Sequence, residues 1–170
     1  METRFNILAR LGLVTVTAGA LYLTGSIDVQ AATNESGALS TSDRTFIKKA
    51  AKGGEMEVTM GNMAAQNASN ADVKSFGQRM VTDHSKANEE LKSIAEKKGV
   101  KLQTQEPSEK WTSDKAYIDM MVKDHEKDLA EFQKEASETN DPDLKQFAEQ
   151  TAKLVQEHLN LAREAQGKLN

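Results

Sequence analysis

The chain contains an internal repeat. Residues 42–47 (SDRTFI) match residues 113–118 (SDKAYI), and residues 72–76 (DVKSF) match residues 143–147 (DLKQF), in both cases 71 positions later. A unit of this length accommodates two helices and a turn. A single helical hairpin cannot bury its own apolar stripe, whereas two hairpins packed together bury both. The repeat therefore predicts an all-α fold, an antiparallel four-helix bundle built from two repeated helical hairpins.

Composition and capping signals predict where the helices lie. After residue 41 the chain is rich in Ala, Lys, Glu, Gln and Met, with apolar residues three or four positions apart. Ser42 and Ser113 can cap helices through their hydroxyl oxygens, Gly99 suits a helix end, and Pro142 suits a first helical position. The predicted helices span residues 43–69, 71–98, 113–139 and 142–166.

The first 31 residues are expected to be a signal peptide. Arg4 and Arg10 give a positively charged start, residues 11–23 are apolar, and small residues precede a cleavage site near Ala31. A retained membrane anchor is the alternative, although this apolar stretch is shorter than the roughly twenty residues that a spanning helix needs. Residues 32–41 are small and polar and predict a flexible lead-in. The bundle then covers residues 42–170, in the periplasm or otherwise exported.

Charge and composition exclude several classes of function. With a net charge of −4 and no cysteine, the chain has neither a strongly basic surface for nucleic acid nor a disulfide framework. It also lacks a Gly-rich phosphate loop, a Ser/His/Asp constellation and a dinucleotide-binding fingerprint. The expected partner is a metal ion, with no nucleic acid and, after signal cleavage, no membrane. A protein partner stays open.

The three histidines of the chain share one local pattern. Residues 80–84 (MVTDH), 121–125 (MVKDH) and 154–158 (LVQEH) each end in a histidine that follows an acidic residue. Each histidine falls on the apolar stripe of a different predicted helix, since it is spaced three or four residues from apolar neighbours. His84, His125 and His158 are therefore expected to point into the core of the bundle.

The first predicted helix contributes a carboxylate instead of a histidine. The repeat puts Gly54 where the third helix has His125, and Glu57 is the acidic residue on the stripe of small residues. Measured from the turn of each hairpin, Glu57 pairs with His84, and His125 with His158, within one helical turn. Counting back from the end of the second helix and forward from the start of the third gives the same agreement. One level of the bundle is predicted to collect all four side chains.

These residue types suit a mononuclear transition-metal site. Neutral imidazoles bind zinc, copper, iron or nickel, and a carboxylate can complete four-coordination. The predicted metal ligands are Glu57, His84, His125 and His158, although the identity of the metal stays open. Asp83, Asp124 and Glu157 are predicted to support them by accepting N–H bonds from imidazoles of neighbouring helices. The alternative is a buried network of histidine and acid hydrogen bonds that holds no metal.

With these motifs, the chain resembles an exported bacterial ferritin-like family known as domain of unknown function 4142. The resemblance covers about residues 42–166 and is carried by residues 53–58 (GGEMEV), 69–84, 117–125 and 157–158. It implies the fold and export, and no settled activity. Glu57 and the three histidines match recurrent polar core positions of this family.

The sequence departs from ferritins in its metal-ligand pattern. Di-iron members of that fold use Glu-x-x-His motifs, whereas Val81, Val122 and Val155 stand three residues before the histidines. We therefore expect a non-catalytic protein that binds, buffers or senses a metal, with a role in stress response as one setting. Two alternatives stay open: a structural or stress-protective interaction domain without metal, and a redox metalloenzyme acting on oxygen or peroxide.

Overall fold

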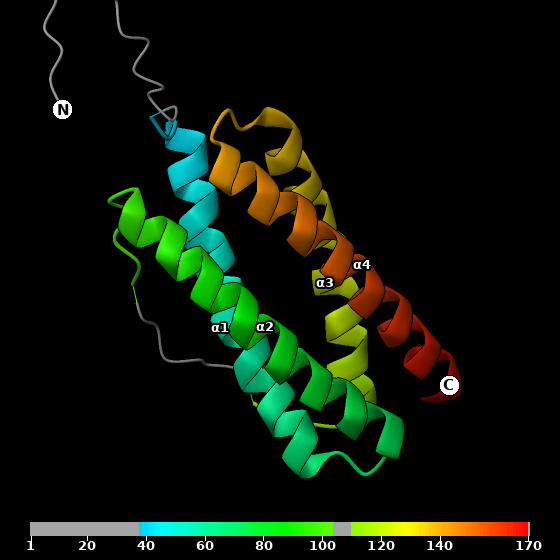
Figure 1. Cartoon of the computed structure of the whole chain (residues 1–170). Coiled ribbons are helices and arrows are strands. Elements are labelled where there is room, and N and C mark those ends of the chain that lie inside the picture. The colour runs from blue at the N-terminus through cyan, green and yellow to red at the C-terminus, as the bar shows by residue number, and fades with distance from the viewer. Residues whose placement is uncertain (1–37, 104–109, 170) are drawn as a thin grey trace, which may run out of the picture. The chain divides into compact units, whose positions relative to one another are not determined.

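The computed structural model describes residues 38–103 and 110–169, which form four α-helices (Figure 1). The helices are α1 (Thr41–Asn67), α2 (Ala71–Lys97), α3 (Asp114–Glu138) and α4 (Pro142–Leu169). This confirms the predicted all-α four-helix bundle, with helix ends close to those expected. The predicted signal peptide, its cleavage site near Ala31 and most of the predicted lead-in lie outside the described residues.

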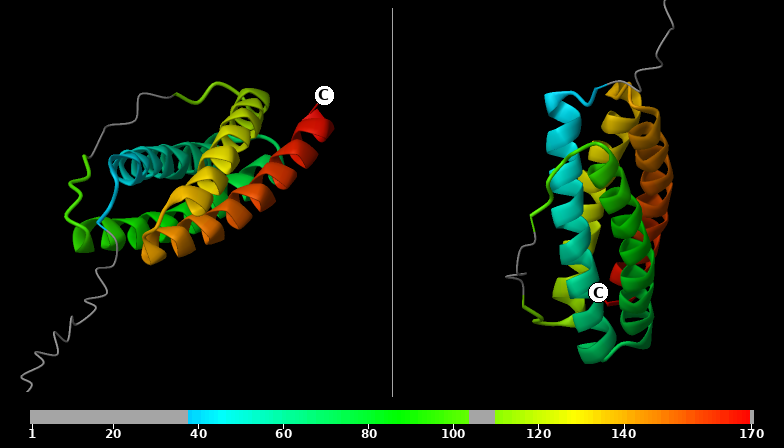
Figure 2. Two further views of the ribbon diagram at one scale, coloured as in Figure 1. Left: turned by 90° about the horizontal axis from the view of Figure 1, so that it is seen from above. Right: turned by 60° about the vertical axis from the view of Figure 1, so that its left-hand side comes forward.

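The two hairpins have their turns at opposite ends of the bundle, as Figures 1 and 2 show. The backbone N–H of Asn70, in the α1–α2 turn, donates to Asp114 at the start of α3 over 2.7 Å. At the other end, Lys98 after α2 pairs with Asp141 in the α3–α4 turn. Helices α2 and α3 therefore run parallel, and the end of α2 and the start of α3 lie at opposite ends of the bundle, as in ferritin-like topology.

The start of α1 differs from the prediction. Ser40, not Ser42, is the N-cap: its hydroxyl accepts the N–H of Asp43 at 3.0 Å, and the Asp43 carboxylate accepts the N–H of Ser40 at 2.8 Å. This reciprocal pair is a capping box, which requires the acid three residues after the cap. Leu39, expected in the flexible lead-in, is buried in the core. The bundle therefore begins a few residues earlier than predicted.

The core consists of two apolar clusters at different levels along the bundle. One contains Ile47, Leu91, Phe132 and Phe147, and the other contains Met60, Met80, Met121 and Ala162, among others. On each helix, a buried polar residue stands between the members of the two clusters. The polar residues are Glu57 on α1, His84 on α2, His125 on α3 and His158 on α4. The expected inward-facing set thus forms a polar layer between two apolar layers.

Helices α1 and α2 approach closely at two glycines. A Cβ built on Gly77 would lie 2.7 Å from the carbonyl oxygen of Gly61 and 2.9 Å from the backbone nitrogen of Ala65. Both contacts are to backbone, so an added methyl group cannot be accommodated by a rotamer change. Glycine at this position therefore allows the close approach of the two helices.

Gly77→Ala is expected to lower the free energy of unfolding by about 1–2 kcal/mol, because overpacking against backbone exceeds the gain in helix propensity. Gly53→Ala is the matched control on α1, since a Cβ there meets nothing within 4 Å. It should raise the same free energy by about 0.5–1 kcal/mol. Urea unfolding followed by circular dichroism measures both changes. Equal effects of the two substitutions would contradict the close-approach interpretation.

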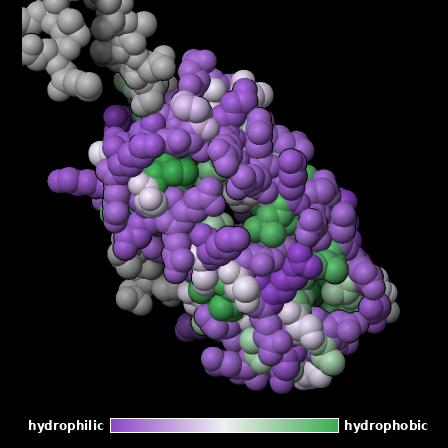
Figure 3. All heavy atoms as spheres, in the orientation of Figure 1, coloured by the Kyte–Doolittle hydropathy of each residue, from purple (hydrophilic) through white to green (hydrophobic). Residues whose placement is uncertain are grey.

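The surface is predominantly polar. On the face shown in Figure 3, hydrophilic side chains cover most of the area, and hydrophobic side chains lie between them in small groups. Over residues 38–103 and 110–169, no helix has the length and apolarity required to cross a membrane.

Candidate metal centre

The three histidines meet in the polar layer, each from a different helix. His125 and His158 are completely buried, and His84 is 3% exposed. One ring nitrogen from each lies within 4.8 Å of those of the other two. Their ring centroids are 5.1–5.8 Å apart. The structure therefore brings together the imidazoles that the helical spacing predicts to face the core.

Two carboxylates orient two of the imidazoles. His84 Nδ1 is 2.9 Å from Glu57 Oε2, and His158 Nε2 is 2.9 Å from Asp83 Oδ2. A carboxylate accepts hydrogen bonds, so each of these ring nitrogens carries the proton. The other two nitrogens, His84 Nε2 and His158 Nδ1, face each other at 3.2 Å. When both rings are neutral, the layer holds two lone pairs directed at one another.

The pKa shifts favour ionised Glu57 and Asp83 and neutral His125 and His158. Burial raises the pKa of Glu57, but charge interaction and a hydrogen bond with His84, together with the other two histidines, outweigh it and lower the pKa. Burial likewise raises the pKa of Asp83, and His158 and Arg79 lower it overall. Burial lowers the pKa of His158 to about 4 in spite of the opposing bond from Asp83. A cation placed between the facing nitrogens would thus meet two lone pairs, with a carboxylate behind each of the two rings.

His125 is the least satisfied member of the layer. Among the described residues, neither of its ring nitrogens has a hydrogen-bond partner of ordinary geometry. Its Nε2 lies 3.6 Å from Glu57 Oε1, which is also buried and unpartnered within the described part of the chain. Burial lowers the pKa of His125, and the charge of Glu57 and the backbone carbonyl of Met121 oppose this. Buried polar atoms without hydrogen-bond partners are rare and destabilising. His125 and Glu57 Oε1 can therefore each make a further polar contact.

The expected supporting acids take different places. Asp83 accepts from His158, as predicted. Glu157 does not hold an imidazole: its carboxylate accepts from Arg79 Nη2 at 2.8 Å. Arg79 Nε in turn donates to Asp83 at 3.1 Å, so Glu157 acts on the site only through Arg79. Asp124 is half-buried on α3 and contributes to the raised pKa of Asp128.

Two residues near the layer were missed in the sequence. Arg79 lies one helical turn before Asp83, and an i,i+4 pair of opposite charge is a signal that could have found it. Asp128 lies three residues after His125 and therefore on a neighbouring part of the same face. Burial, with the charge of Glu57, raises the pKa of Asp128 to about 7. Asp128 is therefore only partly ionised near pH 7, and it lies on the side of the layer next to Glu57.

The geometry suits a small cation. In a tetrahedral zinc site with Zn–N bonds of about 2.0–2.1 Å, two ligand nitrogens lie about 3.3–3.4 Å apart. The 3.2 Å between His84 Nε2 and His158 Nδ1 agrees with that spacing. Glu57 stands behind His84, so it fits the role of a carboxylate that orients a ligating histidine better than that of a direct ligand through Oε2. The other carboxylate oxygen of Glu57, Oε1, takes no part in the bond to His84.

The comparisons with known proteins show the class of fold. The chain is similar to a solved two-domain protein from Anabaena variabilis that contains DJ-1/ThiJ/PfpI-like and ferritin-like domains, with a TM-score of 0.61 and 16% sequence identity. The match covers 77% of this chain and 38% of that protein, so this chain spans well under half of its length. No curated protein matches the sequence. The bundle is of the ferritin-like class.

The family is shown by the sequence itself. The model of the family described as domain of unknown function (DUF4142) matches residues 28–165. The chain belongs to this family, which confirms the resemblance inferred from the motifs around Glu57 and the three histidines.

Proposed function

We propose that the protein binds one divalent transition-metal ion through His84, His125 and His158 and serves to buffer or sense that metal. One observation carries the proposal: His84 Nε2 and His158 Nδ1 face each other at 3.2 Å while carboxylates hold the opposite nitrogens. Two lone pairs in this arrangement repel unless a proton or a metal ion lies between them. Imidazole nitrogen is a good donor to zinc, copper and iron.

The remaining residues have supporting roles in this proposal. His125 has ring nitrogens without partners among the described residues and supplies the third donor after a small shift. Glu57 and Asp83 fix the tautomers of His84 and His158, and Arg79 fixes Asp83. The bound metal would be a Lewis acid with three nitrogen donors.

Metal titration tests the proposal. The mature protein is expected to bind one equivalent of Co²⁺ or Zn²⁺, with Co²⁺ giving the visible absorption of a nitrogen-ligated ion, and the triple variant His84→Leu, His125→Leu, His158→Leu is expected to bind none. Native metal content of the protein from its own cell envelope adds the identity of the ion. Binding of less than about a tenth of an equivalent of metal by the wild-type protein would contradict the proposal.

Asp83→Asn is expected to weaken metal binding by about 10–100-fold, because it removes the charge that orients His158. The fold should be unaffected, since Asp83 lies partly at the surface. Glu157→Gln is the control, because Glu157 is exposed and acts one step further out, through Arg79. Its effect should be much smaller. Isothermal titration of both variants measures the ratio, and equal losses would show that the Asp83–His158 bond has no special role.

A second function is favoured by the same distance. A proton shared between His84 and His158 also fits a separation of 3.2 Å, and the layer would then be a structural hydrogen-bond network in an interaction or stress-protective domain. In that case chelators leave the stability unchanged. Replacement of all three histidines by leucine would also be tolerated or stabilising, as is often found for buried polar groups.

A further inference from the structure

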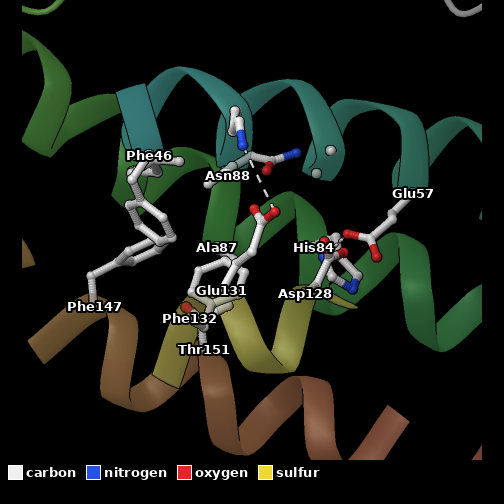
Figure 4. A pocket seen from close by; sticks show the side chains of 15 residues that line it. Phe46, Glu57, His84, Ala87, Asn88, Asp128, Glu131, Phe132, Phe147 and Thr151 are labelled. Atoms are coloured by element: carbon white, nitrogen blue, oxygen red, sulfur yellow. Dashed lines mark ion pairs between the residues drawn. The ribbon is translucent and has the colours of Figure 1, made fainter. Parts of the chain in front are cut away.

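A cavity of about 40 Å³ borders the polar layer on one side. It lies between α1, α2 and α3, with α4 closing its base (Figure 4). A buried water needs about 10–15 Å³ of such space, so the cavity accommodates a few waters or a partly hydrated ion. Glu57 and His84 line its inner end, and apolar side chains line one wall, including Phe46, Phe132 and Phe147.

The outer end of the cavity is closed by weak contacts. Lys49 and Glu131 line it and form an ion pair at 3.8 Å, with their side chains 64% and 34% exposed. Exposed pairs of this kind add little stability and open readily. Asn88 of α2 lies across Gly54 of α1, where an added Cβ would fall 2.0 Å from Asn88 Oδ1. The glycine that stands at the position of a histidine in the repeat therefore makes room for this side chain.

The inner end of the cavity carries two carboxyl groups, one of which has an unused acceptor oxygen. Asp128 and Glu57 both line it, from α3 and α1. Glu57 is 3% exposed, and its Oε1 has no hydrogen-bond partner in the part of the chain that the structure describes. Carboxylate oxygens bind partly hydrated divalent cations well. By contrast, the groove between α2 and α4 has no histidine in its lining.

We infer that this cavity is the path by which a divalent cation reaches the histidines, with Asp128 and Glu57 Oε1 forming an intermediate binding position on the way. The inference rests on the proposed metal-binding function. The ion would enter between Lys49 and Glu131, exchange water for the two carboxylates, and pass to the imidazole nitrogens beyond His84. A path residue alters the barrier and leaves the final ligands in place, so it changes the rates of binding and release by one factor.

Stopped-flow absorbance with Co²⁺ tests the path. Ala50→Leu projects a larger apolar side chain from the cavity wall, and Ala51→Leu is the matched control, since both alanines are partly buried against the same apolar cluster and Ala51 does not line the cavity. Ala50→Leu should slow both association and dissociation by about tenfold or more and leave Kd unchanged. Ala51→Leu should have wild-type rates. Ala50→Val, which adds less volume, should fall between them.

Asp128→Asn tests the intermediate position with little change of size. It should slow Co²⁺ association by about tenfold, whereas Asp119→Asn, on the same helix and outside the cavity, should not. Wild-type rates in both Ala50→Leu and Asp128→Asn would overturn the path and leave the proposed function standing. Failure of the wild-type protein to bind Co²⁺ would overturn the proposed function, and the path with it. Circular dichroism checks whether Ala50→Leu alters the folded structure. If it does, the rates of Ala50→Val decide whether the cavity is the path.

Discussion

Zinc at about a thousand times its Kd is expected to raise the free energy of unfolding by about 4 kcal/mol. The reason is linkage: the folded chain brings three imidazoles within 4.8 Å of one another, and the unfolded chain does not. In the metal-free protein, His84 Nε2 and His158 Nδ1 face each other, and His125 has no hydrogen bond of ordinary geometry among the described residues. Metal binding would remove the repulsion between the two facing nitrogens and would give a His125 ring nitrogen a partner. The measurement is the urea midpoint in zinc and in chelator.

The triple leucine variant is the control for this prediction. It should lose the zinc dependence and show one urea midpoint under both conditions. If the wild-type midpoint also stays the same in zinc and in chelator, the layer is a hydrogen-bond network and the metal-binding proposal fails. Partial binding of zinc to the unfolded chain would only reduce the shift, so a series of zinc concentrations should be used to establish its slope.

Asp141→Ala is expected to lower the free energy of unfolding by about 3 kcal/mol. Asp141 is 1% exposed, its Oδ1 accepts the backbone N–H of Leu144 at 3.0 Å, and its Oδ2 pairs with Lys98. Alanine removes a helix cap, at a cost of about 1 kcal/mol. It also breaks the ion pair between Asp141, which is fully buried, and Lys98. Loss of a buried pair costs about 3–5 kcal/mol, and the loss here should be at or below this range because Asp143 stays 3.5 Å from Lys98.

Asp143→Ala provides the comparison for Asp141. Its side chain is 37% exposed, and its bonds to Lys97 and Lys98 lie near the surface. The loss should be about 1 kcal/mol or less. Urea unfolding of the two variants measures the difference. A loss below about 1 kcal/mol in Asp141→Ala would show that the pair does not hold the end of α2 to the α3–α4 turn.

Counting residues from the helix ends placed Glu57 and the three histidines at one level of the bundle. This placement was correct, although one of the counts assumed the wrong connection between two helices. Counting back from Gly99 and forward from Ser113 treats these two residues as lying at the same end of the bundle, whereas α2 ends and α3 begins at opposite ends. The count agreed because the layer lies near the middle of the helices, where distances from either end are similar. His84 is 13 residues after the start of α2 and His125 is 11 after the start of α3, and both helices begin at the same end.

The sequence by itself determined the helices, the duplicated hairpin and the inward direction of Glu57 and the three histidines. These features follow from local spacing, because side chains three or four apart share a face of a helix. Arg79 could also have been found, from its spacing to Asp83.

Only the tertiary structure decided which groups of the polar layer form hydrogen bonds with one another. Which ring nitrogen of His84 meets Glu57, which of His158 meets Asp83, and the transfer of Glu157 from an imidazole to Arg79 all depend on rotamers and on distances between helices. The crossover between α2 and α3 and the cavity beside Asp128 depend on packing between segments far apart in the chain. Periodicity sets the direction of a side chain to within a face of its helix, whereas a hydrogen bond or a metal ligand requires a position within a few tenths of an ångström.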